Sequence, residues 1–153
     1  MQKGNALKVL DILHKGLLMG QVLFAAACVY LVYSKRLLPS AADLEKILQV
    51  IALIMTAAGI YAGTTIFKKK ILMIRETQAD AMQKFSEYRA ASIFQWALLE
   101  GPSIFCIICF FLTGNYAFLA LSVVIMFLFA TVSPSKNKVL AHLQITEAEL
   151  DEL

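Results

Sequence analysis

Four long apolar runs dominate the chain, and each is long enough to form one membrane-spanning helix. They cover residues 16–34, 47–67, 90–113 and 116–132, and Glu100 is the one charged residue inside them. An α-helix rises about 1.5 Å per residue, so about 20 residues cross the roughly 30 Å hydrocarbon core of a bilayer. The runs lack the two-residue alternation of a membrane β-barrel strand. The pattern therefore predicts an all-α, polytopic membrane protein with a four-transmembrane-helix bundle.

Polar segments divide the chain into three parts. Residues 1–15 form an N-terminal amphipathic segment, residues 16–132 the four-helix membrane domain, and residues 133–153 a polar C-terminal tail. Within the membrane domain, residues 68–89 separate the second and third runs. Their apolar positions recur every three or four residues, as in an amphipathic helix. We therefore expect helical segments outside the membrane, over this connector and in both terminal segments.

Three local features make this organisation more specific. Residues 113–115 are too few for anything but a tight turn between two antiparallel helices. In the N-terminal segment, Leu7, Leu10 and Leu13 are expected to face lipid before the first span. In the tail, Thr146 and Glu149 have the spacing of a capping box, in which each side chain accepts a hydrogen bond from the other residue's backbone N–H. A short helix should therefore begin after Thr146.

Lysine and arginine are distributed unevenly over the two sides of the predicted bundle. Eleven of the 14 fall in the N-terminal segment, the connector and the tail, which share one side, and three fall in the opposite loop, as Lys35, Arg36 and Lys46. Positively charged loops remain in the cytoplasm during membrane insertion. The distribution predicts an integral membrane protein, in the inner membrane if the source is bacterial, with the connector and both termini cytoplasmic.

The amino-acid composition agrees with a membrane location. Hydrophobic residues make up 59% of the chain and charged residues 16%, with a mean hydropathy of +0.71. A soluble domain has about 25% charged residues and somewhat under half apolar residues. Most of the basic residues are accounted for by membrane topology, so a nucleic-acid partner is not expected.

Glu100 is the first candidate for chemistry, because it interrupts an apolar run. An ionised carboxylate inside a membrane costs at least about 2.5 kcal/mol, so we expect this group to be protonated or paired. Pro102 has no N–H, which leaves the carbonyl of Leu98 without its helical partner. Glu100 is therefore a candidate ion- or proton-binding residue. Two structural interpretations stay open: a neutral acid that joins helices by hydrogen bonds, or a residue near an interface marked by Trp96.

Small residues predict close contact between helices. Gly59 and Gly63 form a GxxxG element in the second run, and Gly16 and Gly20 repeat the spacing at the start of the first. Residues four apart lie on one helical face, and glycine lets two backbones approach. We expect these glycines, together with Pro102, to serve helix packing within the monomer rather than dimerisation.

Three consecutive lysines follow the second run, as Lys68, Lys69 and Lys70. A lysine near an anionic membrane surface contributes about 1 kcal/mol of attraction. These residues are therefore candidates for contact with lipid headgroups. A role in membrane insertion alone accounts for them equally well.

Cys106-Ile107-Ile108-Cys109 places two thiols on one face of the third predicted helix. At this element the chain resembles the vitamin K epoxide reductase and disulfide-forming oxidoreductase family, and the resemblance implies thiol redox chemistry. Members of that family also use shuttle cysteines in an outer loop, where this chain has none, since Cys28 lies inside the first run. Thiols flanked by isoleucine and phenylalanine lack a cation that would activate them, so inert buried cysteines are the alternative interpretation.

The sequence contains no recognisable catalytic triad, metal-ligand spacing, phosphate-binding loop or dinucleotide fingerprint, and the isolated His14 and His142 do not alter this. We therefore expect no cofactor and no bound metal. The pattern favours a non-enzymatic integral membrane protein that acts by association with the lipid bilayer, with a membrane-protein partner or with further copies of itself. The alternative is a small transporter or an ion- or proton-conducting subunit that uses Glu100.

Overall fold

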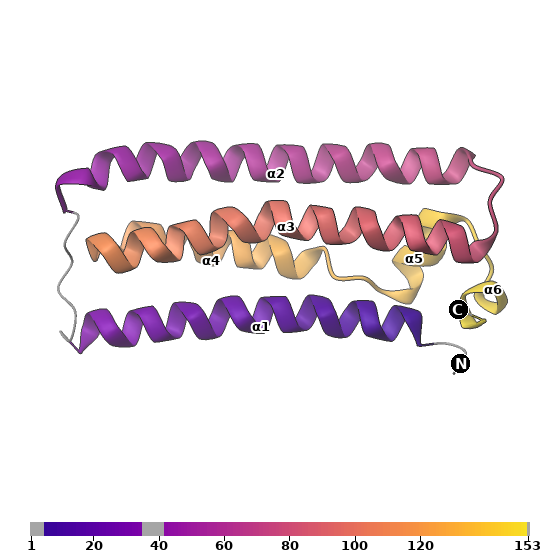
Figure 1. Ribbon diagram of the computed structural model, residues 1–153, viewed down its shortest axis with the longest axis horizontal. Coiled ribbons are helices and arrows are strands. Elements are labelled where there is room, and N and C mark those ends of the chain that lie inside the picture. Colours follow the sequence, from indigo (N-terminus) through magenta and orange to yellow (C-terminus); the bar gives the residue numbers. More distant parts are fainter. Residues whose placement is uncertain (1–4, 35–41, 153) are drawn as a thin grey trace.

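The computed structural model describes residues 5–34 and 42–152, and almost all of them are helical (Figure 1). The elements are α1 (Ala6–Tyr33), the 3-10 helix η1 (Ala42–Leu44), α2 (Glu45–Glu76), α3 (Ala81–Thr113), α4 (Tyr116–Thr131), α5 (Lys136–Leu143) and α6 (Glu147–Asp151). The three longest helices lie side by side along the molecule, and the two short C-terminal helices gather at the end where α2 meets α3 (Figure 1). The all-helical prediction is confirmed for the described residues.

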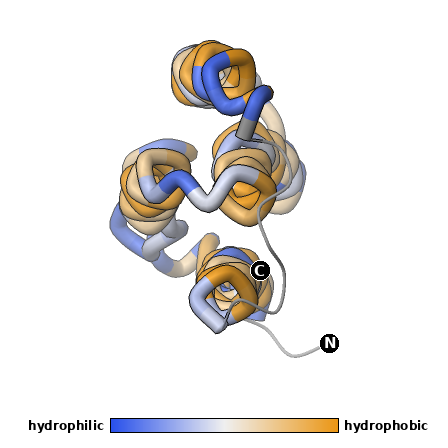
Figure 2. The backbone as a smooth tube through the Cα atoms, turned by 90° about the vertical axis from the view of Figure 1, so that its left-hand side faces the viewer, coloured by the Kyte–Doolittle hydropathy of each residue, from blue (hydrophilic) through white to orange (hydrophobic). Residues whose placement is uncertain are grey.

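Three helices, α1, α2 and α3, are long and apolar enough to cross a membrane. The fourth, α4, has 16 residues and reaches such a length only together with α5, across a bend of 69°. Seen end-on, α3 and α4 lie between α2 on one side and α1 on the other (Figure 2). In the most apolar window of α3, 44% of the residues are buried, against 17% in α1 and 22% in α2. The third helix is therefore the centre of the bundle.

Helix termini follow from residues that cap them locally. The Asp80 side chain accepts a hydrogen bond from the Gln83 N–H at 2.8 Å and begins α3. At the other end of α3, Gly114 adopts a left-handed conformation with φ 71°, which glycine tolerates without strain. Asn115 then accepts a bond from the Ala117 N–H and begins α4. The predicted turn at 113–115 is confirmed, and so is the capping box of Thr146 that begins α6.

Two segments differ from the expectation. The N-terminal helix is not separate from the first span, because α1 runs without a break from Ala6 to Tyr33. Leu10 is 1% exposed and packs in the core, so the expectation that it faces lipid was wrong. The connector 68–89 is helical on both sides of a turn at 77–80, so α2 and α3 each extend beyond their apolar runs.

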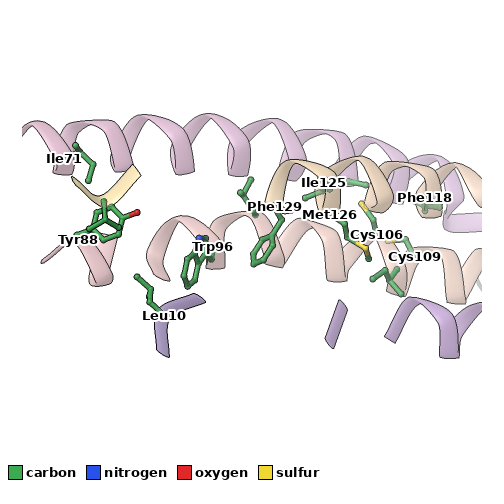
Figure 3. Packing of buried hydrophobic residues seen from close by; sticks show 14 of the residues in the cluster. Leu10, Ile71, Tyr88, Trp96, Cys106, Cys109, Phe118, Ile125, Met126 and Phe129 are labelled. Atoms are coloured by element: carbon green, nitrogen blue, oxygen red, sulfur yellow. The ribbon is translucent and has the colours of Figure 1, made fainter. Parts of the chain in front are cut away.

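Apolar side chains cover the outside of the bundle as well as its core. Inside, a continuous cluster extends from Ile71 and Tyr88 past Trp96 and Phe129 to Cys109 near the opposite end (Figure 3). Outside, large apolar side chains remain exposed on all four long helices; they include Leu23, Leu53, Ile54, Tyr61, Phe94, Val124 and Phe127. A soluble protein rarely leaves so much apolar surface uncovered. This outer surface, hereafter the apolar belt, suits contact with lipid.

Candidate functional site

Basic residues gather at one end of the molecule, where α1 begins, α2 ends, α3 begins and α5 lies (Figure 1). We call this the basic end. Among the described residues it carries Lys8, Lys15, Lys68, Lys69, Lys70, Arg75, Lys84, Arg89, Lys136 and Lys138. The opposite end of the described chain carries Lys46. The three consecutive lysines after the second apolar run are all exposed, so their ammonium groups are available to a ligand or a membrane surface.

Two of these basic residues hold the C-terminal tail against the bundle. The guanidinium group of Arg75 donates to the carbonyl oxygens of Ala141 and His142, each at 3.0 Å, and so caps the C-terminus of α5. Lys138 donates to the carbonyl oxygens of Thr131 and Ser133 at 2.8 and 3.0 Å, just after α4 ends. Cations are favourable at helix C-termini, where carbonyl groups lack partners. From the sequence these charges are explained by topology alone, because their carbonyl partners are not apparent without the fold.

An aromatic cluster lies under α5 at the basic end. The ring of His142 is 5.6 Å from that of Phe67 on α2 and 5.9 Å from that of Tyr88 on α3. Burial lowers the pKa of His142, and the nearby charges of Arg75 and Lys138 lower it further. A neutral imidazole fits such an apolar setting. The tail, α2 and α3 therefore form one folded cap rather than three independent segments.

A groove separates α2 from α3 on the flank of this cap. Its volume is about 770 Å³, and it is lined by Ile66, Lys70, Met73 and Thr77 of α2 and by Glu87, Ala90, Ala91 and Phe94 of α3. Ile66, Phe94 and the two alanines line the part nearer the apolar belt. Lys70 and Glu87 bring opposite charges into the part farther from it, where Met73 and Thr77 also lie. The sequence does not predict this groove, because its lining comes from two helices whose pairing beyond the membrane is visible only in the fold.

Glu100 lies on the rim of the buried face of α3. Its side chain is half-buried, one turn away from the buried Trp96 and one turn from the buried Ser103. In the described chain it forms no hydrogen bond or ion pair. The carbonyl of Leu98, which Pro102 leaves free, instead faces Gly59 of α2.

The predicted packing glycines fall into two groups. At Gly59 an added Cβ would clash with the Leu98 carbonyl oxygen and lie 2.9 Å from Pro102 Cγ, while at Gly63 it would meet its nearest atoms at 3.6 Å. The backbones of α2 and α3 therefore approach more closely at Gly59 than at Gly63. Around Gly16 and Gly20 an added Cβ would meet no atom within 4 Å. The expected packing role of these two glycines has no counterpart among the described helices, because they lie on the outer side of α1.

His14 joins α1 to the bundle. Its Nε2–H donates to the carbonyl oxygen of Phe129 at 3.0 Å, and its ring stacks on that of Phe129 at 4.6 Å and meets Trp96 edge-on at 4.8 Å. Gln21 follows seven residues later on the same face, 2% exposed, with both amide atoms unpaired among the described residues. Since α1 and α3 run in the same direction, Gln21 lies at the height of Ser103, seven residues after Trp96. The sequence does contain a signal for this buried face of α1: His14, Gln21 and Cys28 recur every seven residues, which places them on one side of a helix.

Cys28, Cys106 and Cys109 are all buried and free of disulfides. In the described part of the chain, His, Cys, Asp and Glu side chains form no group of three that could hold a metal ion. No protein-family description matches the sequence, and no curated protein or solved structure is significantly similar to it. Any function assigned to the chain therefore depends on its own residues and their geometry.

Proposed function

We propose that this chain is a non-enzymatic, four-span integral membrane protein that acts by association with lipids or with other membrane proteins through its basic end, which faces the cytoplasm. One observation carries the proposal: α2 passes from the apolar belt to exposed lysines at 68–70 and continues into a folded cap with α3 and α5. The apolar belt suits lipid tails, and the exposed lysines suit the anionic headgroups beside them.

The fourth span is the least conventional part of this topology. At about 1.5 Å per residue, the 16 residues of α4 measure about 24 Å, short of a typical hydrocarbon core. The uncharged residues that follow, as far as Ser135, and a modest local thinning of the bilayer supply the remainder. Lys138, bonded to carbonyl groups at this end of α4, then lies at the cytoplasmic headgroups.

Native mass spectrometry of the gently extracted protein tests the proposal. We expect a phospholipid or a partner protein to be retained in a fixed ratio. Replacing Lys68, Lys69 and Lys70 together by Gln should lower that ratio, whereas Lys46→Gln at the opposite end should not. A protein that retains neither lipid nor partner under any mild extraction contradicts the proposal.

A second candidate function, ion or proton transport, rests on the intramembrane polar groups. Glu100 has no partner in the described chain, and Gln21 and Ser103, both buried with unpaired polar atoms, lie at nearly the same height. Ionisable groups within spans commonly mark ion or proton pathways. For a transporter, proteoliposomes should show proton or cation flux that Glu100→Gln abolishes and Glu45→Gln preserves. Absence of flux, or flux unchanged in Glu100→Gln, eliminates this candidate.

A further inference from the structure

The groove between α2 and α3 is lined by two opposite charges, Lys70 on α2 and Glu87 on α3. Gly63 packs against Gln95, and the two helices are antiparallel. Lys70 lies seven residues after Gly63 on α2, and Tyr88 lies seven residues before Gln95 on α3. Lys70 is therefore level with Tyr88, the neighbour of Glu87. Both charged side chains are exposed and line the same groove.

These two charges do not neutralise each other. Salt bridges among the described residues join Lys15 to Asp11 and Lys136 to Glu147, and neither Lys70 nor Glu87 takes part in one. Neither side chain forms a hydrogen bond within the described chain. The groove that both side chains line has a volume of about 770 Å³, which is enough for a small headgroup bearing both charges.

The groove also changes character along its length. Ile66 and Phe94, which are 37% and 50% exposed, line the end next to the apolar belt. Ala90 and Ala91 leave room in the middle, and Thr77 lies farthest from the belt. The apolar end beside the belt, followed by the two charges, matches the order of acyl chain and headgroup in a phospholipid that enters from the cytoplasmic leaflet; Met73 and Thr77 lie beyond the charges.

We propose that this groove binds a phospholipid with a phosphoethanolamine headgroup. Lys70 donates to the phosphate, Glu87 accepts from the primary ammonium, and one acyl chain lies against Ile66 and Phe94. Charge-assisted hydrogen bonds of this kind are short and strong. The inference rests on the proposed membrane topology and adds a defined lipid to the proposed function.

Other headgroups fit the pair of charges less well. A phosphatidylglycerol headgroup satisfies Lys70 but places no cation beside Glu87, which then faces a like charge. A choline headgroup carries a cation without N–H donors, so Glu87 gains no hydrogen bond from it. Free phosphoethanolamine has the correct charges but leaves the apolar part of the groove uncovered.

The experiment is native mass spectrometry of the full-length protein released from nanodiscs that contain equal amounts of phosphatidylethanolamine and phosphatidylglycerol. The wild-type protein should retain the ethanolamine lipid preferentially. Loss of one charge-assisted bond should lower its retention roughly tenfold in Lys70→Gln and in Glu87→Gln. Lys46→Gln and Glu76→Gln are the controls, since both residues are exposed on α2 and line no part of the groove. These controls should retain the lipid as the wild type does.

Three results overturn the inference: equal or preferred retention of phosphatidylglycerol, unchanged retention in Glu87→Gln, or displacement of the lipid by millimolar free O-phosphoethanolamine. A protein that loses its preference but still retains other lipids or a partner protein refutes the headgroup assignment and leaves the proposed function standing. A protein that retains nothing contradicts both.

Discussion

Helices α2 and α1 are attached to the central helix α3 in different ways. At the α2–α3 interface the backbones meet: Gly59 packs on the Leu98 carbonyl and on Pro102. At the α1–α3 interface side chains meet, chiefly His14 and Trp96, and Gly16 and Gly20 face away from the bundle. Close backbone packing tolerates no added volume, whereas side-chain packing adapts more easily. The paired helices α2 and α3 therefore form the scaffold of the bundle, and α1 should detach from them more easily than they detach from each other.

Gly59→Ala should have the largest effect. The new methyl group would clash with the Leu98 carbonyl oxygen, a backbone atom that cannot move independently of α3. Overpacking typically costs about 1–3 kcal/mol, and we expect the upper end of that range for the free energy of unfolding in detergent. Thermal unfolding followed by circular dichroism measures it.

Gly63→Ala is the matched control, because the same methyl group there makes ordinary contacts at 3.6 Å. Its stability should equal or slightly exceed that of the wild type. If both alanine variants unfold alike, the close approach at Gly59 is not what holds α2 to α3.

His14→Leu should weaken the attachment of α1 and leave α2–α3 intact. The substitution introduces an apolar side chain of similar size and removes the hydrogen bond to the Phe129 carbonyl. That carbonyl still accepts a bond from the Val132 N–H, so the loss should cost about 0.5–1.5 kcal/mol. Hydrogen exchange should accelerate at the start of α1 and change little in α2. Lys8→Gln, at an exposed position on the same helix, is the control. Uniform acceleration across all helices would contradict the distinction between the two interfaces.

Local sequence patterns predicted most of the fold. The features that these patterns did not predict depend on contacts between residues that are far apart in the chain. The apolar runs indicated the helices, and the capping box at Thr146 was legible because its partners are three residues apart. His14 looked isolated because its hydrogen-bond partner, Phe129, is 115 residues away. The groove at Lys70 and Glu87 was not visible for the same reason, since hydrophobic periodicity along one helix does not say which helix packs beside it.

Arg75→Gln should release the C-terminal tail from the scaffold without loosening either long interface. The substitution removes the guanidinium group that donates to the carbonyls of Ala141 and His142. Because these bonds are partly exposed, their loss should cost roughly 1–2 kcal/mol. Limited proteolysis should cut the tail faster in this variant than in Lys69→Gln, which keeps both hydrogen bonds from Arg75 to α5. Equal rates would show that Arg75 does not hold α5.

Gly16→Ala should have the smallest effect on stability. Unlike Gly59→Ala, it should not destabilise the bundle. An added methyl group meets no atom within 4 Å at this position, and alanine favours a helix over glycine by up to about 1 kcal/mol. The unfolding temperature should stay the same or rise slightly. A clear loss of stability in lipid would mean that another molecule covers this face of α1.

The central claim is that the bundle crosses a membrane with its basic end in the cytoplasm, and single-cysteine labelling in intact cells tests it most directly. Cysteine is introduced at the basic end as Lys69→Cys and at the opposite end as Asp43→Cys, and a membrane-impermeant maleimide is added. The native cysteines are buried and contribute little background. The account predicts labelling of Asp43→Cys in intact cells, and of Lys69→Cys only after permeabilisation. The reverse pattern, or equal labelling of both sites in intact cells, would contradict it.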